Sequence, residues 1–351
     1  MASQEPVLPY RIGALSLILC PILGYCAEPL INIDFGDGNP RNKVDWVSFT
    51  PGGHHIVVRA RGESDEDLIC IWSAEGKHLW DWKLDKRQFH VGIEPKGVFA
   101  PEGDRIVFTS AGMLWSGDLK KGSITDLKAV YTAGGVLGQS CSQIDKEGRV
   151  VVLNVPRDGE LRVQKSAKPR EAGGRELLKL SRRQFDFATL IAESNLLVAS
   201  SRDGQDNPLL EVFELENKAA VLKIEKLPAP LSAAALSPDG ELLAVGRADG
   251  IIDVYSLKGA TLLTSLRVAS LTVTSVAFHP FQKRVVVFAS NDNEGENNVG
   301  LFDIGVRRVI AKLCADPNGI VRLAVSDTGK HVVTCGVRHL KLWKYDDLRG
   351  K

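Results

Sequence analysis

Short apolar runs alternate with polar, turn-forming residues along almost the whole chain. Seven times an apolar run ends in a turn and a second apolar run follows, as at residues 236–245, Leu-Ser-Pro-Asp-Gly-Glu-Leu-Leu-Ala-Val. The seven turns follow Phe49, Phe99, Ile144, Leu190, Leu236, Phe278 and Val325. Turns therefore recur about every 45 residues, and such a period with four short strands is typical of one blade of a β-propeller.

This repeat predicts an all-β fold, a seven-bladed β-propeller of four-stranded blades, with six or eight blades as the alternatives. The predicted blades occupy residues 44–84, 95–130, 138–180, 181–227, 229–268, 270–315 and 317–350. The third blade has the weakest pattern, because residues 165–175 are basic and Gly-rich and indicate a protruding loop.

Residues 30–35, Leu-Ile-Asn-Ile-Asp-Phe, alternate apolar and polar like a half-buried strand but belong to no blade. The last repeat, conversely, has three strand candidates instead of four. We therefore expect residues 30–35 to pair with the last blade as its missing outer strand and to close the ring, which removes an open sheet edge. Residues 28–351 would then form a single β-propeller domain, which we expect to be monomeric.

The third strand of several repeats ends in an aromatic residue, as in residues 69–72, Ile-Cys-Ile-Trp, and 340–343, Leu-Lys-Leu-Trp. With the Ser-Pro-Asp-Gly turn at 237–240 and Ala-Asp-Gly at 248–250, this pattern resembles the WD-repeat family over nearly all of the chain from residue 30. The resemblance implies a non-catalytic scaffold for a protein or peptide partner. The Trp-Asp dipeptide that closes repeats of the family stands at no blade end, and the Gly-His pair does not recur from repeat to repeat. We therefore expect apolar strand packing, rather than a buried His–Asp network, to stabilise the blades.

Charge and cysteine content restrict the possible partners and chemistry. The 351 residues include 44 Lys and Arg against 43 Asp and Glu, a net charge of +1. This balance lacks the basic excess that binds phosphate backbones, so we expect no nucleic-acid partner. Of the six cysteines, Cys70 and Cys335 lie inside apolar strand runs and are predicted to be buried thiols rather than a disulfide.

The N-terminal segment resembles a secretory leader. Residues 12–23 form an apolar run of 12 residues behind Arg11, and small residues precede the polar sequence that starts at Glu28. The run is too short to span a bilayer comfortably. We predict that residues 1–27 are a signal peptide or apolar leader and that the protein is exported, periplasmic or secreted, with no integral membrane span after leader removal. The alternatives are a cytoplasmic protein with an apolar extension and, third, a retained membrane anchor.

The best candidate for a binding surface is the rim that carries the second-to-third-strand loops and the blade-joining loops. Three of these second-to-third loops are acidic, at residues 61–67, 203–207 and 291–298, and two joining loops share an Arg-Gln-Phe pattern, at 86–89 and 182–185. The predicted partner-binding residues are Arg87, Phe89, Arg183, Phe185, Asp65, Glu66, Asp67, Asp292, Glu294 and Glu296. The alternative is a set of ordinary solvated loops whose phenylalanines enter the next inner strand.

Motifs for catalysis are mostly missing. The sequence has no Gly-x-Ser-x-Gly elbow, no His-Glu-x-x-His pair and no P-loop, so we predict no catalytic residues. Residues 291–298 lack the spacing of a calcium-binding loop, and we predict neither a metal nor a cofactor. The alternative function is an exported propeller enzyme, lactonase-like or quinoprotein-like, with a site at the central channel. Residues 76–80, Gly-Lys-His-Leu-Trp, resemble an element of quinoprotein blades but occur once.

Overall fold

The computed structural model of the chain describes residues 28–34, 44–61, 67–84, 98–99, 105–110, 113–120, 123–132, 138–147, 149–156, 160–166, 174–181, 185–191, 194–202, 205, 207–292, 297–336 and 339–349. The predicted leader, residues 1–27, lies outside this part. Among the described residues, no helix is long and apolar enough to cross a membrane.

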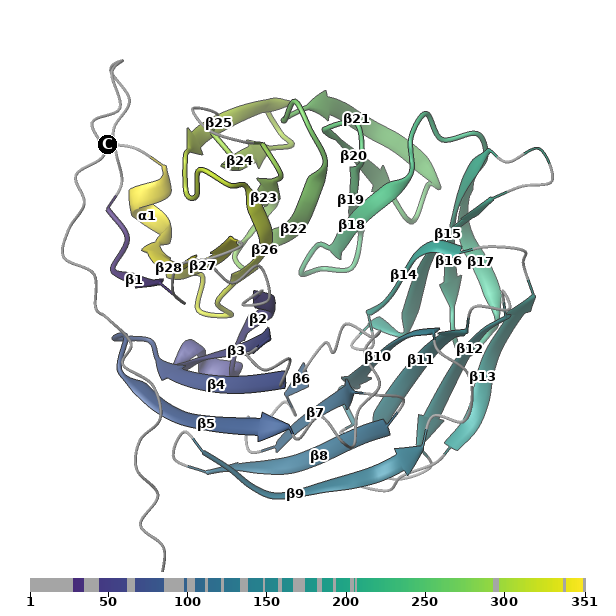
Figure 1. The fold of residues 1–351 in the computed structure, drawn as a ribbon. Coiled ribbons are helices and arrows are strands. Elements are labelled where there is room, and N and C mark those ends of the chain that lie inside the picture. Colours follow the sequence, from purple (N-terminus) through teal and green to yellow (C-terminus); the bar gives the residue numbers. More distant parts are fainter. Residues whose placement is uncertain are drawn as a thin grey trace, which may run out of the picture.

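The described strands form seven antiparallel four-stranded sheets, here called blades one to seven, arranged around a ring (Figure 1). Blade one contains β2 (Val44–Phe49), β3 (His55–Arg61), β4 (Asp67–Ser73) and β5 (His78–Leu84). Blade two contains β6 (Val98–Phe99), β7 (Arg105–Ser110), β8 (Met113–Lys120) and β9 (Ser123–Thr132). Blade three contains β10 (Gly138–Ile144), β11 (Val150–Pro156), β12 (Glu160–Ser166) and β13 (Gly174–Ser181). Blade four contains β14 (Phe185–Ile191), β15 (Leu196–Arg202), β16 (Pro208–Glu214) and β17 (Ala219–Ile224). Blade five contains β18 (Leu231–Leu236), β19 (Leu242–Arg247), β20 (Ile251–Ser256) and β21 (Thr261–Arg267). Blade six contains β22 (Val273–His279), β23 (Gln282–Ser290), β24 (Val299–Asp303) and β25 (Arg308–Leu313). The prediction of an all-β fold of repeated four-stranded sheets is confirmed, and the arrangement is consistent with a seven-bladed β-propeller.

Blade seven combines strands from opposite ends of the sequence. It contains β26 (Ile320–Val325), β27 (His331–Gly336), β28 (His339–Lys344) and, as its outermost strand, β1 (Ile31–Asp34). The β1 strand pairs antiparallel with β28, with Ile31 opposite Leu342 and Ile33 opposite Leu340. The described part of the chain also contains a 3₁₀ turn, η1 (Pro51–Gly53), and the short helix α1 (Tyr345–Leu348).

The recurring turn of the sequence has a common structural basis. In five blades, the first side chain of the turn between first and second strands is buried and accepts backbone N–H bonds; these residues are Thr50, Asp145, Ser237, His279 and Ser326. Ser237 Oγ, for example, accepts the bond from Leu242 N at 2.9 Å. Such a side chain replaces the partner that the backbone lacks where a strand begins.

Glycine completes the turns of blades five and seven. Gly240 and Gly329 have φ angles of 75° and 67°, and each N–H donates back to the carbonyl of the first turn residue at 2.9 Å. A residue with a Cβ atom rarely adopts this left-handed conformation, so the turn requires glycine there. The sequence signature therefore marks a capping side chain followed by a left-handed glycine.

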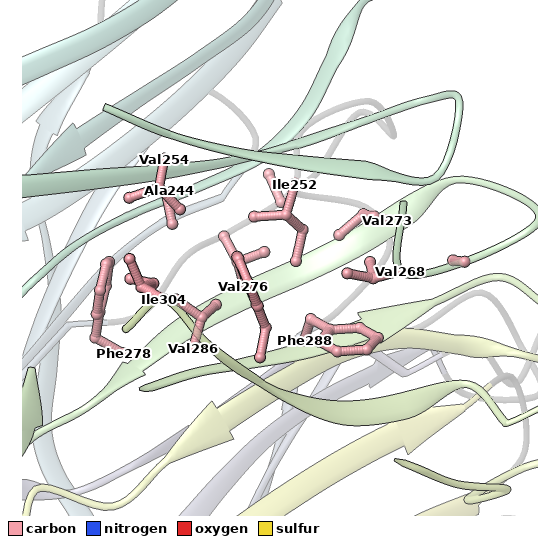
Figure 2. Close-up of a cluster of buried hydrophobic side chains, with 13 residues drawn as sticks. Ala244, Ile252, Val254, Val268, Val273, Val276, Phe278, Val286, Phe288 and Ile304 are labelled. Carbon is pink, nitrogen blue, oxygen red and sulfur yellow. The ribbon is translucent and has the colours of Figure 1, made fainter. Parts of the chain in front are cut away.

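Apolar side chains fill the space between neighbouring blades. Figure 2 shows the cluster between blades five and six, which includes Ala244, Ile252 and Val254 of the former and Val276, Phe278, Val286 and Phe288 of the latter. Gly246 allows this close approach, because a Cβ there would lie 2.9 Å from Val273 Cβ. Burial of each large side chain contributes about 1.5–3 kcal/mol, so inter-blade packing holds this part of the ring together.

A second cluster joins blades one and seven around the two predicted buried cysteines. Cys70 and Cys335 are 1% and 0% exposed, as predicted, and both pack in a cluster that also contains Ile33 of β1. Burial, together with the nearby Asp81 carboxylate, raises the pKa of the Cys70 thiol well above its ordinary value. A thiol in this environment stays protonated and serves as a small apolar group rather than a nucleophile.

Candidate functional site

The antiparallel order of each blade divides its connections between two faces. The first-to-second and third-to-fourth turns lie on one face, here called the turn face. The second-to-third loops and the links between blades lie on the other, here called the loop face. The candidate binding residues were predicted from the sequence to lie on the loop face.

Most of those candidates fall outside the described residues. They are Arg87, Phe89, Arg183, Asp65, Glu66, Glu294 and Glu296, and of Asp67 only the backbone, paired with Arg61, is described. Phe185 and Asp292 are therefore the two candidates whose side chains can be placed.

Phe185 is the first residue of β14 and is half-buried. Its side chain packs against the cluster that joins blades three and four, which contains Leu161 and Leu197. This position agrees with the alternative interpretation of the Arg-Gln-Phe pattern, in which the phenylalanine enters the inner strand.

Asp292 is buried, with 2% of its surface exposed, rather than displayed on the rim as predicted. Its Oδ1 accepts a bond from Leu271 N at 2.7 Å, and its Oδ2 accepts bonds from Ser270 N at 3.3 Å and Ser290 Oγ at 3.0 Å. The carboxylate therefore fixes the link between blades five and six to the second-to-third loop of blade six. An acidic loop composition indicated exposure, but these backbone amides compensate the charge within the fold.

A groove lies beside this fixed link on the loop face, and we call it the loop-face groove. It has a volume of about 360 Å³ and is lined by Arg267, Val268, Ala269, Ser270, Asp292, Asn297 and Lys312. Arg267 and Lys312 are exposed, and Arg267 Nη1 donates to Asp249 O at 2.7 Å. The groove thus combines walls held by internal hydrogen bonds with two cations at its surface.

The loop face of blades six and seven contains a His–Asp contact that the sequence analysis did not expect. The distance between His339 Nδ1 and Asp316 Oδ2 is 2.9 Å, and Asp316 is buried. Asn298 Oδ1 accepts a bond from Ala315 N at 2.9 Å, which ties blade six to the same link. His339 is half-buried, so this is one local His–Asp contact, and the expectation that stability rests mainly on apolar strand packing stays a prediction.

Blade five uses an arginine in a similar position. The side chain of Arg247 is buried and donates from Nη1 to Asp253 Oδ2 at 2.9 Å and from Nε to Asp249 Oδ1 at 3.0 Å. Burial disfavours the charge, but these two carboxylates outweigh it and raise the pKa of Arg247. Charged pairs on this face are therefore used to fix loops.

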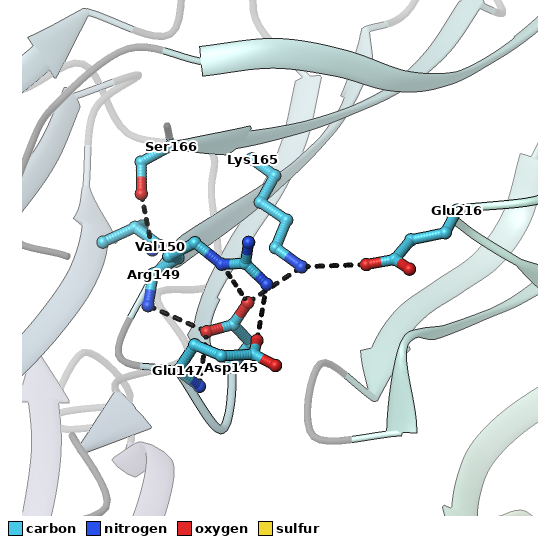
Figure 3. Close-up of polar contacts among 7 residues, drawn as sticks. All are labelled: Asp145, Glu147, Arg149, Val150, Lys165, Ser166 and Glu216. Atoms are coloured by element: carbon cyan, nitrogen blue, oxygen red, sulfur yellow. Dashed lines mark hydrogen bonds and ion pairs between the residues drawn. The ribbon is translucent and has the colours of Figure 1, made fainter. Parts of the chain in front are cut away.

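Figure 3 shows a further polar cluster, on the turn face of blades three and four. Lys165 Nζ lies 2.9 Å from Asp145 Oδ2 and 3.4 Å from Glu216 Oε1, and Arg149 Nε donates to Asp145 Oδ2 at 2.9 Å. Lys165 and Ser166 belong to β12 and are buried, so the predicted protruding loop does not begin at residue 165.

The Asp145 carboxylate stays ionised in this cluster. Burial opposes its charge, but the hydrogen bonds from Lys165 and Arg149 outweigh that effect and lower the pKa of Asp145 below its ordinary value. The Asp145–Lys165 pair is buried within blade three, and Lys165 also contacts the exposed Glu216 of blade four, which fits a structural role.

The described residues contain no group of three or more His, Cys, Asp and Glu side chains arranged to hold a metal ion. A scan against models of known protein families gives no match, and a search of curated proteins finds none that is significantly similar.

Proposed function

We propose that this protein is a non-catalytic interaction scaffold that binds a protein or peptide partner on its loop face. The observation that carries this proposal is the loop-face groove, in which Asp292 holds the wall while Arg267 and Lys312 remain exposed. A surface whose backbone is already fixed loses little conformational freedom on binding, which favours affinity. The degenerate resemblance to WD-repeat proteins supports the same class of function.

The partner that fits this groove is one with an acidic contact region, because both exposed charged side chains in the groove are cationic. The predicted leader supports an exported location, where the partner would be periplasmic or extracellular. The loop residues Arg87 and Arg183 would extend the same rim.

The first test is charge reversal in the groove. We expect the Arg267→Glu/Lys312→Glu variant to lose partners that the wild-type protein captures from its native cells, because the attraction becomes repulsion. The matched control is Lys146→Glu/Lys218→Glu, which makes the same charge change at two exposed turn-face residues. Capture of the same partners in equal amounts by wild-type protein and the groove variant would contradict the loop-face proposal.

We infer that β1 closes the ring by completing blade seven. Ile33 of β1 is 8% exposed and packs in the cluster shared by blades one and seven, beside Leu340 and Leu342. Removing residues 1–34 should therefore lower the free energy of unfolding by about 3 kcal/mol, from lost apolar burial and an uncovered β28 edge. Urea denaturation measures this change, and a truncated protein as stable as one lacking only residues 1–27 would overturn the inference.

A further inference from the structure

A second groove lies between the same two blades on the opposite, turn face. Its volume is about 300 Å³, and we call it the turn-face groove. Leu242 and Leu263 of blade five and Ile304 of blade six supply its apolar lining. No single strand or motif contains these residues; packing of blade five against blade six brings them together.

Three cations surround this lining, and they differ in how they are paired. Lys283 Nζ lies 3.0 Å from Asp239 Oδ2, so its charge is compensated within the fold. Hydrogen bonds from Ser237 and then Lys283 lower the pKa of Asp239 to about 2, and the pair therefore stays ionised at neutral pH. This pair adds no net charge to the groove.

Arg284 and Arg307 are exposed, and neither forms an ion pair or a side-chain hydrogen bond with any described residue. Among the lining residues Glu241 supplies the one further carboxylate, and the Asp303 carboxylate beside the wall is already engaged by backbone N–H groups. The groove consequently offers at least one guanidinium for a carboxylate outside the chain. Guanidinium groups bind carboxylates in a bidentate geometry, which suits them to recognition.

Apolar side chains are also exposed here. Leu263 and Val306 are 40% and 57% exposed, and Val306 belongs to the turn that forms one wall of the groove. Exposed apolar side chains at one polar-rimmed depression indicate an interaction site.

The wall that carries Arg307 is held in place from within. Asp303 Oδ1 accepts bonds from Gly305 N at 2.7 Å and from Val306 N at 3.3 Å. Ile304 N donates to Arg284 O at 2.8 Å, which fixes this turn to β23. The groove is therefore formed before any ligand arrives, and binding need not order the turn.

We propose that the turn-face groove binds an acidic peptide segment of a partner protein. A large apolar side chain of the segment packs between Leu242, Leu263 and Ile304, and flanking carboxylates pair with Arg284 and Arg307. The site lies on the face opposite the loop-face groove, so both can be occupied at once. It goes beyond the function proposed above, since it does not require the loop-face residues.

The test uses immobilised peptides in which one Leu, Phe or Trp is flanked by Glu and Asp, with the corresponding Gln and Asn peptides as the uncharged set. The probe is the full-length protein. We expect it to bind the acidic set at least tenfold more strongly than the amide set, and to bind more weakly as salt concentration rises.

Three variants locate the binding. Arg284→Glu/Arg307→Glu should lose the acidic preference, and Leu263→Ala should weaken binding several-fold while keeping the charge. Lys146→Glu/Lys218→Glu and Arg267→Glu/Lys312→Glu should bind these peptides as the wild-type protein does. Because Arg284 and Arg307 are exposed and unpaired, their reversal should leave the melting temperature unchanged, which separates lost binding from misfolding.

Equal binding of acidic and amide peptides would overturn the proposal, as would undiminished binding by the Arg284→Glu/Arg307→Glu variant. Loss of binding only in the Arg267→Glu/Lys312→Glu variant would assign the acidic peptides to the loop face. That outcome would overturn this inference while supporting the proposed function.

Discussion

The two faces of blades five and six use charged residues differently. On the loop face, Asp292 is buried and accepts bonds from backbone N–H groups. On the turn face, Arg284 and Arg307 are exposed, beside the apolar residue Val306. The buried carboxylate of the loop face therefore holds the link between these blades, whereas Arg284 and Arg307 on the turn face, like Arg267 and Lys312 at the loop-face groove, remain available to a partner. Acidic composition alone did not distinguish these roles.

The largest expected effect comes from breaking a buried loop-face contact. Asp292→Ala removes a carboxylate that accepts three bonds and leaves the N–H groups of Ser270 and Leu271 without it. We expect the free energy of unfolding to fall by about 3 kcal/mol, measured by urea denaturation. Glu241→Ala, the matched change at an exposed turn-face carboxylate, should alter it by less than about 0.5 kcal/mol. Similar losses in both variants would remove the distinction between the faces.

A smaller effect is expected from His279, the histidine among the five described capping side chains of the turn face. Its Nδ1 accepts bonds from Phe281 N at 3.2 Å and Gln282 N at 3.1 Å, and its Nε2 lies 3.1 Å from Gly329 O. Burial disfavours the charged imidazolium form and is the main cause that lowers the pKa of His279.

The sign of the pH dependence follows from this lowered pKa. The unfolded chain binds a proton at His279 more readily than the folded chain does, so stability is complete above about pH 6.5 and declines as the pH falls below that value. One such proton gives a slope of at most about 1.4 kcal/mol per pH unit. We expect His279→Asn to reduce the slope of unfolding free energy between pH 5 and 7, and an unchanged slope would refute the role of this ring.

The smallest effect concerns Ala260, in the turn between β20 and β21. Its φ is 47°, a left-handed conformation that disfavours any residue with a Cβ atom. Ala260→Gly should relieve this strain and raise the free energy of unfolding by about 0.5 kcal/mol. Thermal denaturation measures the gain. Peptide binding at the turn-face groove should stay the same, and a loss there would show that the groove depends on the strained turn.

Local patterns predicted the strands because each repeat encodes its own turn. Ser237 and Gly240 lie within one short segment, and the side-chain cap and the left-handed glycine both follow from it. The N-terminal strand was also accessible to prediction, since Ile31 and Ile33 alternate with polar residues and the last repeat needed a partner.

Contacts between residues that lie far apart in the sequence could not be predicted from local patterns. Asp316 and His339 are 23 positions apart and meet only because the link before blade seven folds onto β28. The turn-face groove likewise requires blade five to pack on blade six, since Leu263 and Ile304 come from different sheets. Asp292 was assigned to the surface because its loop is acidic, and its amide donors are more than 20 residues earlier.

The most direct test of the contrast between the faces is carboxylate labelling of the folded, full-length protein at neutral pH, followed by mass spectrometry. The rate of modification at each Asp and Glu reports its accessibility. We expect Asp292 and Asp316 on the loop face to be protected and Glu241 on the turn face to be modified rapidly. Modification of Asp292 as fast as that of Glu241 would contradict the account.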